Sequence, residues 1–329
     1  MLIYYSGVTK SMDPRDIVPG SSVMAAFSGS QKTELRGKNY FMDSGSFSLL
    51  KKAAKYRTTS GREPESYYKT EEHIEYVNGY AKFIKDRIEY LDIYANVDVI
   101  GLGEKGAKLS LLNQRYLEEE HGLKPMPVLH NGEPLRFLAK YLEAGHTLIG
   151  LGGLAGLSLS LWSWVETVFL ELKKSNVDVR VHGFGVTGYD KILRYPWYSV
   201  DSTTWVKTAG FGQIIVPNQR KYGRGKREFV FDLIPSRVFV SEHEEGQAYK
   251  NHTGNQHLNV NTNVEEWLDF IDVKYTFHTG NEERKKIFLE PMARIEANLK
   301  FFELARVKKA TTLGVRPPGF DTEILKTGV

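Results

Sequence analysis

The chain has 329 residues, 41% of them hydrophobic and 26% charged, which is ordinary for a soluble globular protein of one large or two smaller domains. It contains no cysteine, which excludes disulfide bonds and thiolate metal sites and fits a reducing cytoplasm. The net charge of +4 permits a polyanionic partner without requiring one.

No segment is expected to direct the chain into a membrane. Residues 1–16 (MLIYYSGVTKSMDPRD) lack the basic stretch followed by a long apolar one that a signal peptide has. The longest apolar run, at 147–162, is broken by glycine and serine and is too short and mixed to span a bilayer. We therefore expect a cytoplasmic protein without a membrane partner.

Short runs typical of β-strands recur up to residue 217. Several are nearly continuous apolar stretches, as in strands that are buried on both faces. The predicted strands are 22–28, 38–43, 92–100, 124–130, 146–152, 178–184, 197–201 and 212–217.

Stretches with helical periodicity lie between many of these strands. Eight strands with helical crossovers predict an α/β fold of the (β/α)8 TIM-barrel class over residues 1–219, with a doubly wound open sheet as the alternative. The predicted helices are 65–90, 107–120, 134–144 and 158–174.

The composition changes after residue 217. The region 220–329 is expected to form a basic loop and a small, mostly helical C-terminal appendage packed on the barrel. Its predicted segments are a basic stretch at 220–229 (RKYGRGKREF), a polar loop at 247–263, helices at 264–271 and 282–308, and a loose extension from 309.

Polar and glycine residues follow the predicted strands where each one ends. In a barrel the chemistry lies at the carboxyl ends of the strands, so we expect these residues to converge on one face. They are Asp43, Asp98, His130, Gly152 with Gly153, Gly183 to Gly185, and Asp201, at the second to seventh strands.

Asp43 and Asp201 have similar local sequences. Each ends an apolar or aromatic run, and each is followed at once by small polar residues that can turn the chain. Two carboxylates at strand ends are the groups that cleave a glycosidic bond. The alternative is that each aspartate caps a turn or a helix.

Five short motifs in this order resemble those of the tRNA-guanine transglycosylase superfamily, over most of residues 20–220. Each one is short, but their order and spacing are similar to those of the family. They are 43–47 (DSGSF, for the family's DSGGF), 127–132 (PVLHNG, for VQGG), 152–155 (GGLA, for GGLA), 181–185 (VHGFG, for LMGVG) and 200–202 (VDS, for FDC).

The departures from the family pattern are informative. The tRNA enzymes of the family have a zinc site of three cysteines and one histidine, which a chain without cysteine cannot form. The basic signature that usually follows the nucleophile is replaced by 202–205 (STTW), and His130 stands where the family has glutamine. This pattern is more similar to the branch, found in phages and bacteria, that inserts 7-deazaguanines into DNA. A phage-encoded member would act in the host cytoplasm.

The resemblance implies a mechanism for the two aspartates. Asp201 would attack C1′ of the guanine nucleoside and form a covalent glycosyl-enzyme, which an incoming 7-deazaguanine such as preQ0 would resolve with net retention. Asp43 would be the general acid and base. The reaction needs no cofactor, because the aspartyl intermediate conserves the glycosyl bond energy.

The resemblance also implies residues that bind the base. Asp98 would accept hydrogen bonds from the N1–H and 2-amino groups of guanine and so reject adenine; alternatively it is a solvent-facing strand residue, and Asp92 is the partner. Backbone N–H groups of the 152–155 loop would approach the base's carbonyl oxygen, since glycine permits a close approach. Lone histidines are more often structural than functional. The positions implied are Asp98, His130, Gly152, Gly153, Leu154, His182, Ser44 and Phe47.

The expected macromolecular partner is DNA, with tRNA as the alternative. The target base would have to leave the duplex stack, and the aromatic residues Trp197, Tyr198 and Trp205 would stack on bases or, as is commoner, fill the core. The basic stretch would grip phosphates or form a solvated loop. Its charged residues are Arg220, Lys221, Arg224, Lys226 and Arg227.

Two other functions remain open, and a metal site is not expected. A catalytically silent nucleic-acid-binding relative and a barrel glycoside hydrolase are the alternatives to base exchange. We predict no metal site, because His252, His257 and His278 do not have the spacing of a known one and are expected in loops.

Overall fold

The structure is a computed structural model. It describes residues 1–8, 12–27, 35, 37–156, 162–175, 177–186, 188–222, 226–231, 233–241, 263–278 and 286–312.

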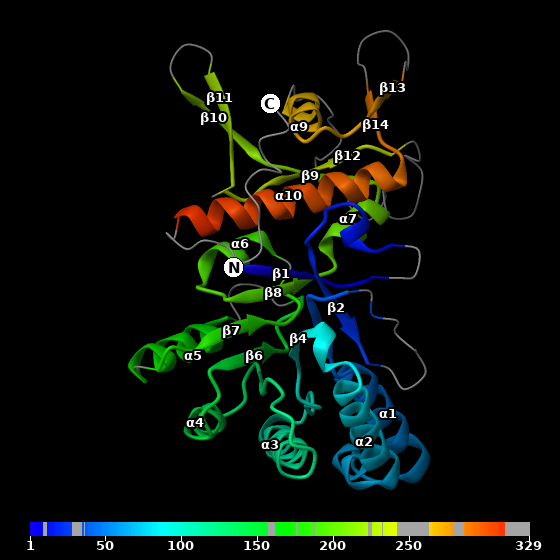
Figure 1. Cartoon of the computed structure of the whole chain (residues 1–329), viewed down its shortest axis with the longest axis vertical. Helices are drawn as coiled ribbons and strands as arrows, with labels where there is room; N and C mark the ends of the chain where they lie inside the picture. The colour runs from blue at the N-terminus through cyan, green and yellow to red at the C-terminus, as the bar shows by residue number, and fades with distance from the viewer. Residues whose placement is uncertain are drawn as a thin grey trace. The chain divides into compact units, whose positions relative to one another are not determined.

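Eight strands form one sheet in the order β4-β3-β2-β1-β8-β7-β6-β5 (Figure 1). The pairs β2–β3, β3–β4, β5–β6, β6–β7 and β7–β8 are parallel. The strands are β1 (Leu2–Tyr5), β2 (Ser22–Ala26), β3 (Tyr40–Asp43), β4 (Leu91–Tyr94), β5 (Val128–His130), β6 (Leu148–Gly152), β7 (Arg180–Gly183) and β8 (Ser199–Ser202).

The sheet is open between its first and last strands, β4 and β5. A single parallel bridge, between Ala95 and Met126, is the pairing that joins the chain just after β4 to the chain just before β5. The predicted α/β class with eight strands is confirmed, and the sheet is TIM-like but not a closed barrel.

One of the eight predicted barrel strands was wrong. The run 212–217 does contain a strand, β9 (Gln213–Val216), but β9 pairs antiparallel with β12 (Ser236–Phe239) and lies outside the eight-stranded sheet. The place in the sheet belongs to β1, a four-residue strand that is not among the predicted ones. An apolar run shows that a strand is buried but not which strand it pairs with.

The predicted helices between the strands are confirmed, and they flank the sheet (Figure 1). Three helices were not predicted: α1 (Ser46–Ser60), α6 (Tyr189–Arg194) and α7 (Thr204–Gly210). The confirmed helices are α2 (Glu71–Lys85) with the 3-10 turns η2 (Pro64–Lys69) and η3 (Ile88–Tyr90) on either side, α3 (Gly103–Glu119), α4 (Arg136–Glu143) and α5 (Ser163–Lys174). A further 3-10 turn, η1 (Pro14–Asp16), follows β1.

Contacts divide the chain into two compact units. Unit 1 comprises Met1–Ser21, Thr187–Tyr195 and Ser202–Val329, and unit 2 comprises Ser22–Val186 and Pro196–Asp201. The sequence suggested one boundary at 219/220, where the composition changes. The contacts instead group the N-terminal residues with the C-terminal ones.

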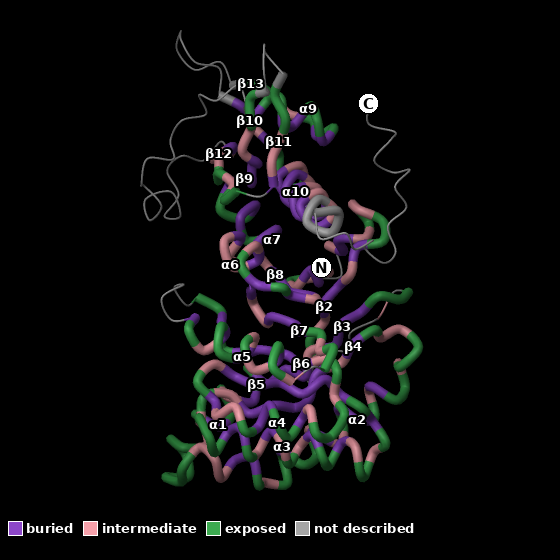
Figure 2. Tube along the Cα trace, turned by 90° about the vertical axis from the view of Figure 1, so that its left-hand side faces the viewer, coloured by how far each residue is buried: buried purple, intermediate pink, exposed green. Residues whose placement is uncertain are grey.

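The core of unit 2 packs α1 and α2 against the ends of β3 and β4. Thr70 caps α2 by accepting a hydrogen bond from the backbone N–H of His73, and the apolar face of that helix is buried. Burying a large aliphatic side chain stabilises a fold by about 1.5–3 kcal/mol, so this layer holds the strand ends firmly. Figure 2 shows buried positions along the strands; the cluster includes Met42, Leu49, Ala53, Val77, Tyr80, Ile84, Val97 and Val99.

Unit 1 mixes helices with short antiparallel pairs. Asn298 of α10 (Pro291–Thr312) is buried, accepts a hydrogen bond from the backbone N–H of Ile215 in β9 and donates one to the carbonyl of Trp205 in α7. Besides β9–β12, the pairs are β10 (Asn218–Tyr222) with β11 (Lys226–Val230) and β13 (Thr276–His278) with β14 (Lys286–Phe288).

Three C-terminal predictions need correction. The basic stretch is not a loop, because its residues on both sides of 223–225 form the paired strands β10 and β11. The helix predicted from 282 begins at Pro291, since proline fits the first turn of a helix and β14 comes before it. His278 lies in β13 rather than in a loop.

The other C-terminal predictions are confirmed, corrected in part or untested. Helix α9 (Asn263–Phe270) confirms the prediction at 264–271. The loop predicted at 247–263, with His252 and His257, lies outside the described residues except for Asn263, which begins α9. The loose extension predicted from 309 is wrong for its first four residues, because α10 continues to Thr312, and the rest of it lies outside the described residues. None of the helices in the described ranges has the length and hydropathy that crossing a bilayer requires.

Candidate functional site

The predicted site residues of unit 2 lie along one edge of the sheet. Asp43 is the last residue of β3, His130 of β5 and Gly152 of β6, and Asp201 lies in β8. In the parallel ladders His130 is level with Gly152, and Leu151 is level with Gly183. Asp98 follows β4 by four residues, because that strand ends at Tyr94 rather than near 100 as predicted.

Asp43 has an unusual protonation equilibrium for a carboxylic acid. Burial, followed by the charges of Asp98 and Asp201, raises its pKa to about 7, against the lowering effect of hydrogen bonds from the backbone N–H groups of Gly45 and Ser44. The carboxyl group therefore exchanges its proton near neutral pH, which suits a group that acts first as an acid and then as a base.

The turn after Asp43 requires glycine. Gly45 has φ +78°, and a Cβ atom there would lie 2.1 Å from the carbonyl oxygen of Phe27 and 2.6 Å from the hydroxyl of Tyr76. That hydroxyl is within hydrogen-bond distance of the carbonyls of Phe27 and Ser44, at 2.8 and 2.7 Å. The close approach fixes where α1 begins and where Asp43 points.

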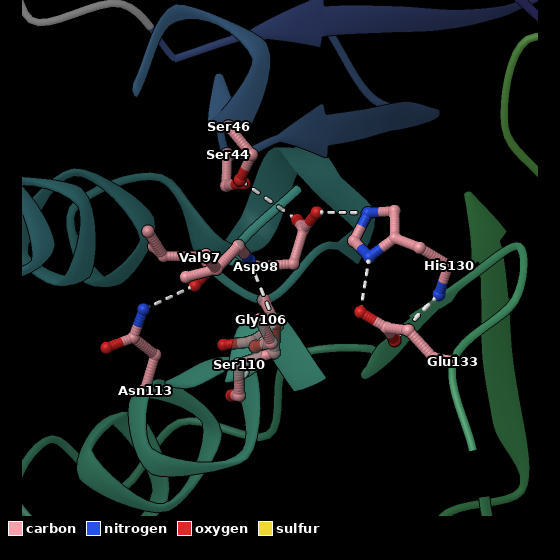
Figure 3. A network of polar contacts seen from close by, with 11 residues as sticks. Ser44, Ser46, Val97, Asp98, Gly106, Ser110, Asn113, His130 and Glu133 are labelled. Carbon is pink, nitrogen blue, oxygen red and sulfur yellow. Dashed lines mark hydrogen bonds and ion pairs between the residues drawn. The ribbon is translucent and has the colours of Figure 1, made fainter. Parts of the chain in front are cut away.

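The carboxylate of Asp98 is held by a hydroxyl group from α1 and an imidazole group from β5 (Figure 3). The Ser46 hydroxyl donates to Asp98 Oδ1 at 2.9 Å and lies 2.8 Å from the hydroxyl of Ser44. Asp98 Oδ2 faces His130 Nε2 at 2.8 Å. The residues on either side of Asp98 are tied to α3, because the Asn113 amide donates to the carbonyl of Val97 and the Ser110 hydroxyl accepts from the N–H of Val99.

His130 lies between two carboxylates, Asp98 and Glu133. Its Nδ1 is 3.4 Å from Glu133 Oε1, and its backbone N–H donates to Glu133 Oε2 at 2.9 Å. Burial alone would lower the pKa of His130, but the hydrogen bonds and charges of Asp98 and Glu133 outweigh it and raise the pKa to about 10. The ring is therefore a cation at neutral pH, with an N–H toward each carboxylate. Both ring nitrogens of His130 thus face carboxylates of the protein. The sequence predicts instead that His130 contacts the base.

His182 has the opposite character. Burial lowers its pKa, and Asp201 offsets this only in part. Its Nδ1 lies 2.9 Å from the Ser199 hydroxyl and its Nε2 lies 3.6 Å from Asp201 Oδ1, while Phe41 and Phe184 pack edge-on against the ring. A neutral imidazole surrounded by these groups does not carry charge; it orients the side chains of Ser199 and Asp201.

Asp201 Oδ1 accepts a short hydrogen bond, 2.6 Å, from the backbone N–H of Gly185. Gly185 follows β7 and has φ +63°. The glycine segment at 183–185 therefore orients the carboxylate of the neighbouring strand, a role that its position in the sequence did not reveal.

The remaining predicted base-binding residues differ in exposure. Gly152 lets the His130 ring approach β6, because a Cβ there would be 2.6 Å from the ring. Gly153 has φ +71°, and the Leu154 side chain is buried in the core. Phe47, in the first turn of α1, is 61% exposed with Lys51 over its ring, so an aromatic face is accessible there.

The aromatic residues near Asp201 are not a stacking surface. Trp197 and Trp205 are both buried, and Trp197 packs edge-on against Trp162 and Phe169. Tyr198 is half-buried and has the guanidinium of Arg180 over its ring. The commoner interpretation of these tryptophans, as core residues, is confirmed.

The predicted phosphate-binding residues lie in unit 1 on the β10–β11 pair. Lys221 is opposite Arg227 and Arg220 is opposite Glu228, so the two pairs lie on opposite faces of the ribbon. Arg227 forms an ion pair with Glu266 of α9 at 3.2 Å. Arg224 and the side chain of Lys226 lie outside the described residues.

Sequence reasoning assigned no role to three supporting residues, Ser46, Glu133 and Ser199. Each contacts a predicted site residue, namely Asp98, His130 and His182 respectively. Ser46 lies within the 43–47 motif, whereas Glu133 and Ser199 lie just outside the motifs at 127–132 and 200–202. Within the described ranges, no group of three or more histidine, aspartate or glutamate side chains has a geometry that would hold a metal ion.

Comparison with protein-family models and with curated proteins finds no match for this chain.

Proposed function

We propose that the protein is a transglycosylase that exchanges guanine for a 7-deazaguanine base, such as preQ0, in DNA. The observation that carries the proposal is the gathering of two carboxylates at one sheet edge, with the pKa of Asp43 near 7 and Asp201 oriented by a backbone N–H. The motif resemblance supplies the substrate class. We assign the open, TIM-like sheet to the (β/α)8 class, because the Ala95–Met126 bridge pairs the chain just after β4 with the chain just before β5.

In the first half of the proposed reaction, a carboxylate oxygen of Asp201 attacks C1′ of the target nucleotide. The bond from C1′ to guanine N9 breaks, its electron pair leaves with the base, and Asp43 gives its proton to the departing guanine. Gly185 and His182 hold Asp201 in one orientation during the attack.

In the second half, the Asp43 carboxylate takes the N9 proton from the incoming 7-deazaguanine. The freed N9 attacks C1′ and displaces Asp201, so protons balance over the cycle and the configuration is retained. A pKa near neutrality serves both halves, because Asp43 must be a competent acid and then a competent base at one pH.

Asp98 is the proposed reader of the base. Its two oxygens offer about four lone-pair sites, and Ser46 and His130 use one on each oxygen. The remaining sites can accept the N1–H and 2-amino groups of guanine or a 7-deazaguanine. Adenine presents no such pair of donors, so it would leave the buried carboxylate poorly satisfied.

The test is release of radiolabelled guanine from duplex DNA and from tRNA, each with a 7-deazaguanine present. We expect release from DNA, its loss in Asp201→Asn, and no loss in Asp178→Asn, which changes an exposed aspartate. Intact-mass detection of a glycosyl-enzyme would identify the intermediate.

The other outcomes each point to a different function. Release from tRNA alone keeps the chemistry and changes the substrate. Binding of DNA without release from either nucleic acid, by a folded protein, favours the catalytically silent binding relative.

A further inference from the structure

We propose that Glu133 is a positioning residue which, through His130, fixes the carboxylate of Asp98 as the acceptor for the donor edge of the base. This inference rests on the proposed function and adds a specificity-determining residue to it. Glu133 belongs to none of the motifs in the sequence.

Glu133 is almost completely buried and is held by several hydrogen bonds. It is 3% exposed, its backbone N–H donates to the carbonyl of His130, and its own carbonyl accepts from the indole of Trp164. Both carboxylate oxygens face His130, one at the backbone N–H and one at the ring. The contact of Glu133 with the backbone N–H of His130 is enough to close the turn between these two residues. A buried charge is costly unless it is paired, so we attribute a further role to the contact of Glu133 with the His130 ring.

The ring of His130 has little freedom to turn. On one side it lies against Gly152, where even a Cβ atom would be 2.9 Å from Nε2. At its two ends it meets Glu133 and Asp98. An N–H on Nδ1 directed at Glu133 and an N–H on Nε2 directed at Asp98 can coexist only in the protonated ring.

Loss of that proton would affect Asp98 directly. In a neutral ring one nitrogen carries a lone pair, and if this were Nε2 it would face Asp98 Oδ2 at 2.8 Å. Asp98 would then keep only the Ser46 hydroxyl and be free to turn away from the base. Glu133 opposes this because, together with Asp98, it raises the pKa of His130 and so helps to retain the proton on the ring.

Three further titratable groups near this cluster have raised pKa values, namely Tyr68, Tyr141 and Asp43. Burial first, and then the charge of Asp98, raises the pKa of Tyr68 in η2 to about 12. Burial and the charge of Glu133 raise the pKa of Tyr141 in α4 still further. Asp43 titrates near 7, so every variant must be compared with wild type at the same pH.

The experiment measures the affinity of the full chain for free 7-deazaguanine by calorimetry between pH 6 and 9. Glu133→Gln keeps an acceptor for the His130 backbone N–H and removes the charge. We expect near-wild-type affinity at pH 6 and a loss of about tenfold relative to wild type at pH 8.5, because removing the charge of Glu133 lowers the pKa of His130. Glu143→Gln, an exposed change in the neighbouring helix, should follow wild type throughout.

The deciding part of a second measurement is made on the wild-type protein. The His130 ring shifts in the NMR spectrum of the wild-type protein should stay those of the charged ring up to pH 9, and in Glu133→Gln they should titrate below that pH. Titration of wild-type His130 below pH 8 would overturn the inference.

Failure of this inference and failure of the proposed function are distinguishable. If wild type binds the base and Glu133→Gln matches it at every pH, the positioning role is wrong and the function stands. If wild type binds neither guanine nor a 7-deazaguanine, the proposed function is wrong, and with it the ligand assigned to Asp98.

Discussion

The buried histidines His130 and His182 of unit 2 differ in charge, one a cation and the other neutral, because their neighbours differ. His130 has a carboxylate at each ring nitrogen, whereas His182 has a hydroxyl at one, a carboxylate 3.6 Å from the other and aromatic rings around it. The sequence assigned both of them the same role, contact with the base. A histidine's charge is decided by groups that are distant in sequence, so residue type alone does not separate a cation from a neutral ring.

Asp43→Asn should make the protein more stable and less active. The folded pKa of Asp43, about 7, lies above its unfolded value, so its contribution to stability is complete below about pH 4 and is lost as the pH rises through 7. Asparagine is uncharged at every pH. The variant should therefore gain about 1–3 kcal/mol in free energy of unfolding over wild type at pH 8, with the difference vanishing near pH 4.

Urea unfolding of both proteins at several pH values measures this difference, and guanine release measures the activity. Asp178→Asn, at an exposed position, should show neither effect. If Asp43→Asn were less stable than wild type at pH 8, the ionised carboxylate of Asp43 would not destabilise the folded protein, and the prediction would be wrong.

Gly45→Ala should be far more damaging than another substitution at a glycine with positive φ. Gly45 combines φ +78° with backbone and hydroxyl oxygens within 2.6 Å of the new Cβ, whereas Gly61 has φ +69° and open space. The strain common to both costs about 1 kcal/mol. We expect Gly61→Ala to lose about that much and Gly45→Ala to lose at least about 3 kcal/mol, measured by chemical denaturation. Equal losses in free energy of unfolding would show that the Tyr76 hydroxyl moves away from the new Cβ atom at little cost.

At the scale of elements, burial was easier to predict than pairing. The strands that carry Asp43, His130, Gly152 and Asp201 were predicted because their apolar runs are distinctive. Strand β9 was assigned to the wrong sheet, because a buried run has the same pattern in either. Helix α1 was missed because it buries only Ser46, Leu49 and Ala53, so its sequence has a weak apolar face.

The β10–β11 ribbon makes a prediction about binding nucleic acid. Lys221 is exposed, whereas Arg227, opposite it, has its charge partly offset by Glu266. Lys221→Ala should therefore weaken DNA binding and lower the salt slope of the affinity by about 1, and Arg227→Ala should do less.

Fluorescence anisotropy with duplex DNA over a range of salt concentrations measures both effects. Lys85→Ala, an exposed change in α2 of unit 2, is the control. A larger effect for Arg227 than for Lys221 would contradict the assignment of the ion pair, and no effect for either would place the phosphate contacts elsewhere.

At the scale of the whole molecule, unit 1 is built from segments at both ends of the chain. Tyr5 of β1 donates a hydrogen bond to Glu303 of α10 at 2.8 Å, across 298 positions of sequence. Arg306 completes the group, with its Nε 2.9 Å from the other oxygen of Glu303. No local pattern could have predicted this grouping, since charge and composition change only near residue 217.

Removing the charge of Arg306 alone should lower the free energy of unfolding more than removing the charges of both Glu303 and Arg306. Glu303 and Arg306 are each about 5% exposed, so Arg306→Met leaves a carboxylate buried beside Tyr5 alone. We expect a loss of about 3 kcal/mol in free energy of unfolding, and a smaller loss for Glu303→Gln combined with Arg306→Met, because no charge is then stranded.

Glu171 and Lys174 supply the matched control, since they have the same i,i+3 spacing on a solvent-facing part of α5. Lys174→Met should cost less than about 0.5 kcal/mol, as exposed ion pairs contribute little. Urea denaturation of all four proteins decides the matter. If Arg306→Met costs no more than Lys174→Met, the buried group does not stabilise the association of the N-terminal strand with α10, and the joining of the two chain ends in unit 1 depends on apolar packing alone.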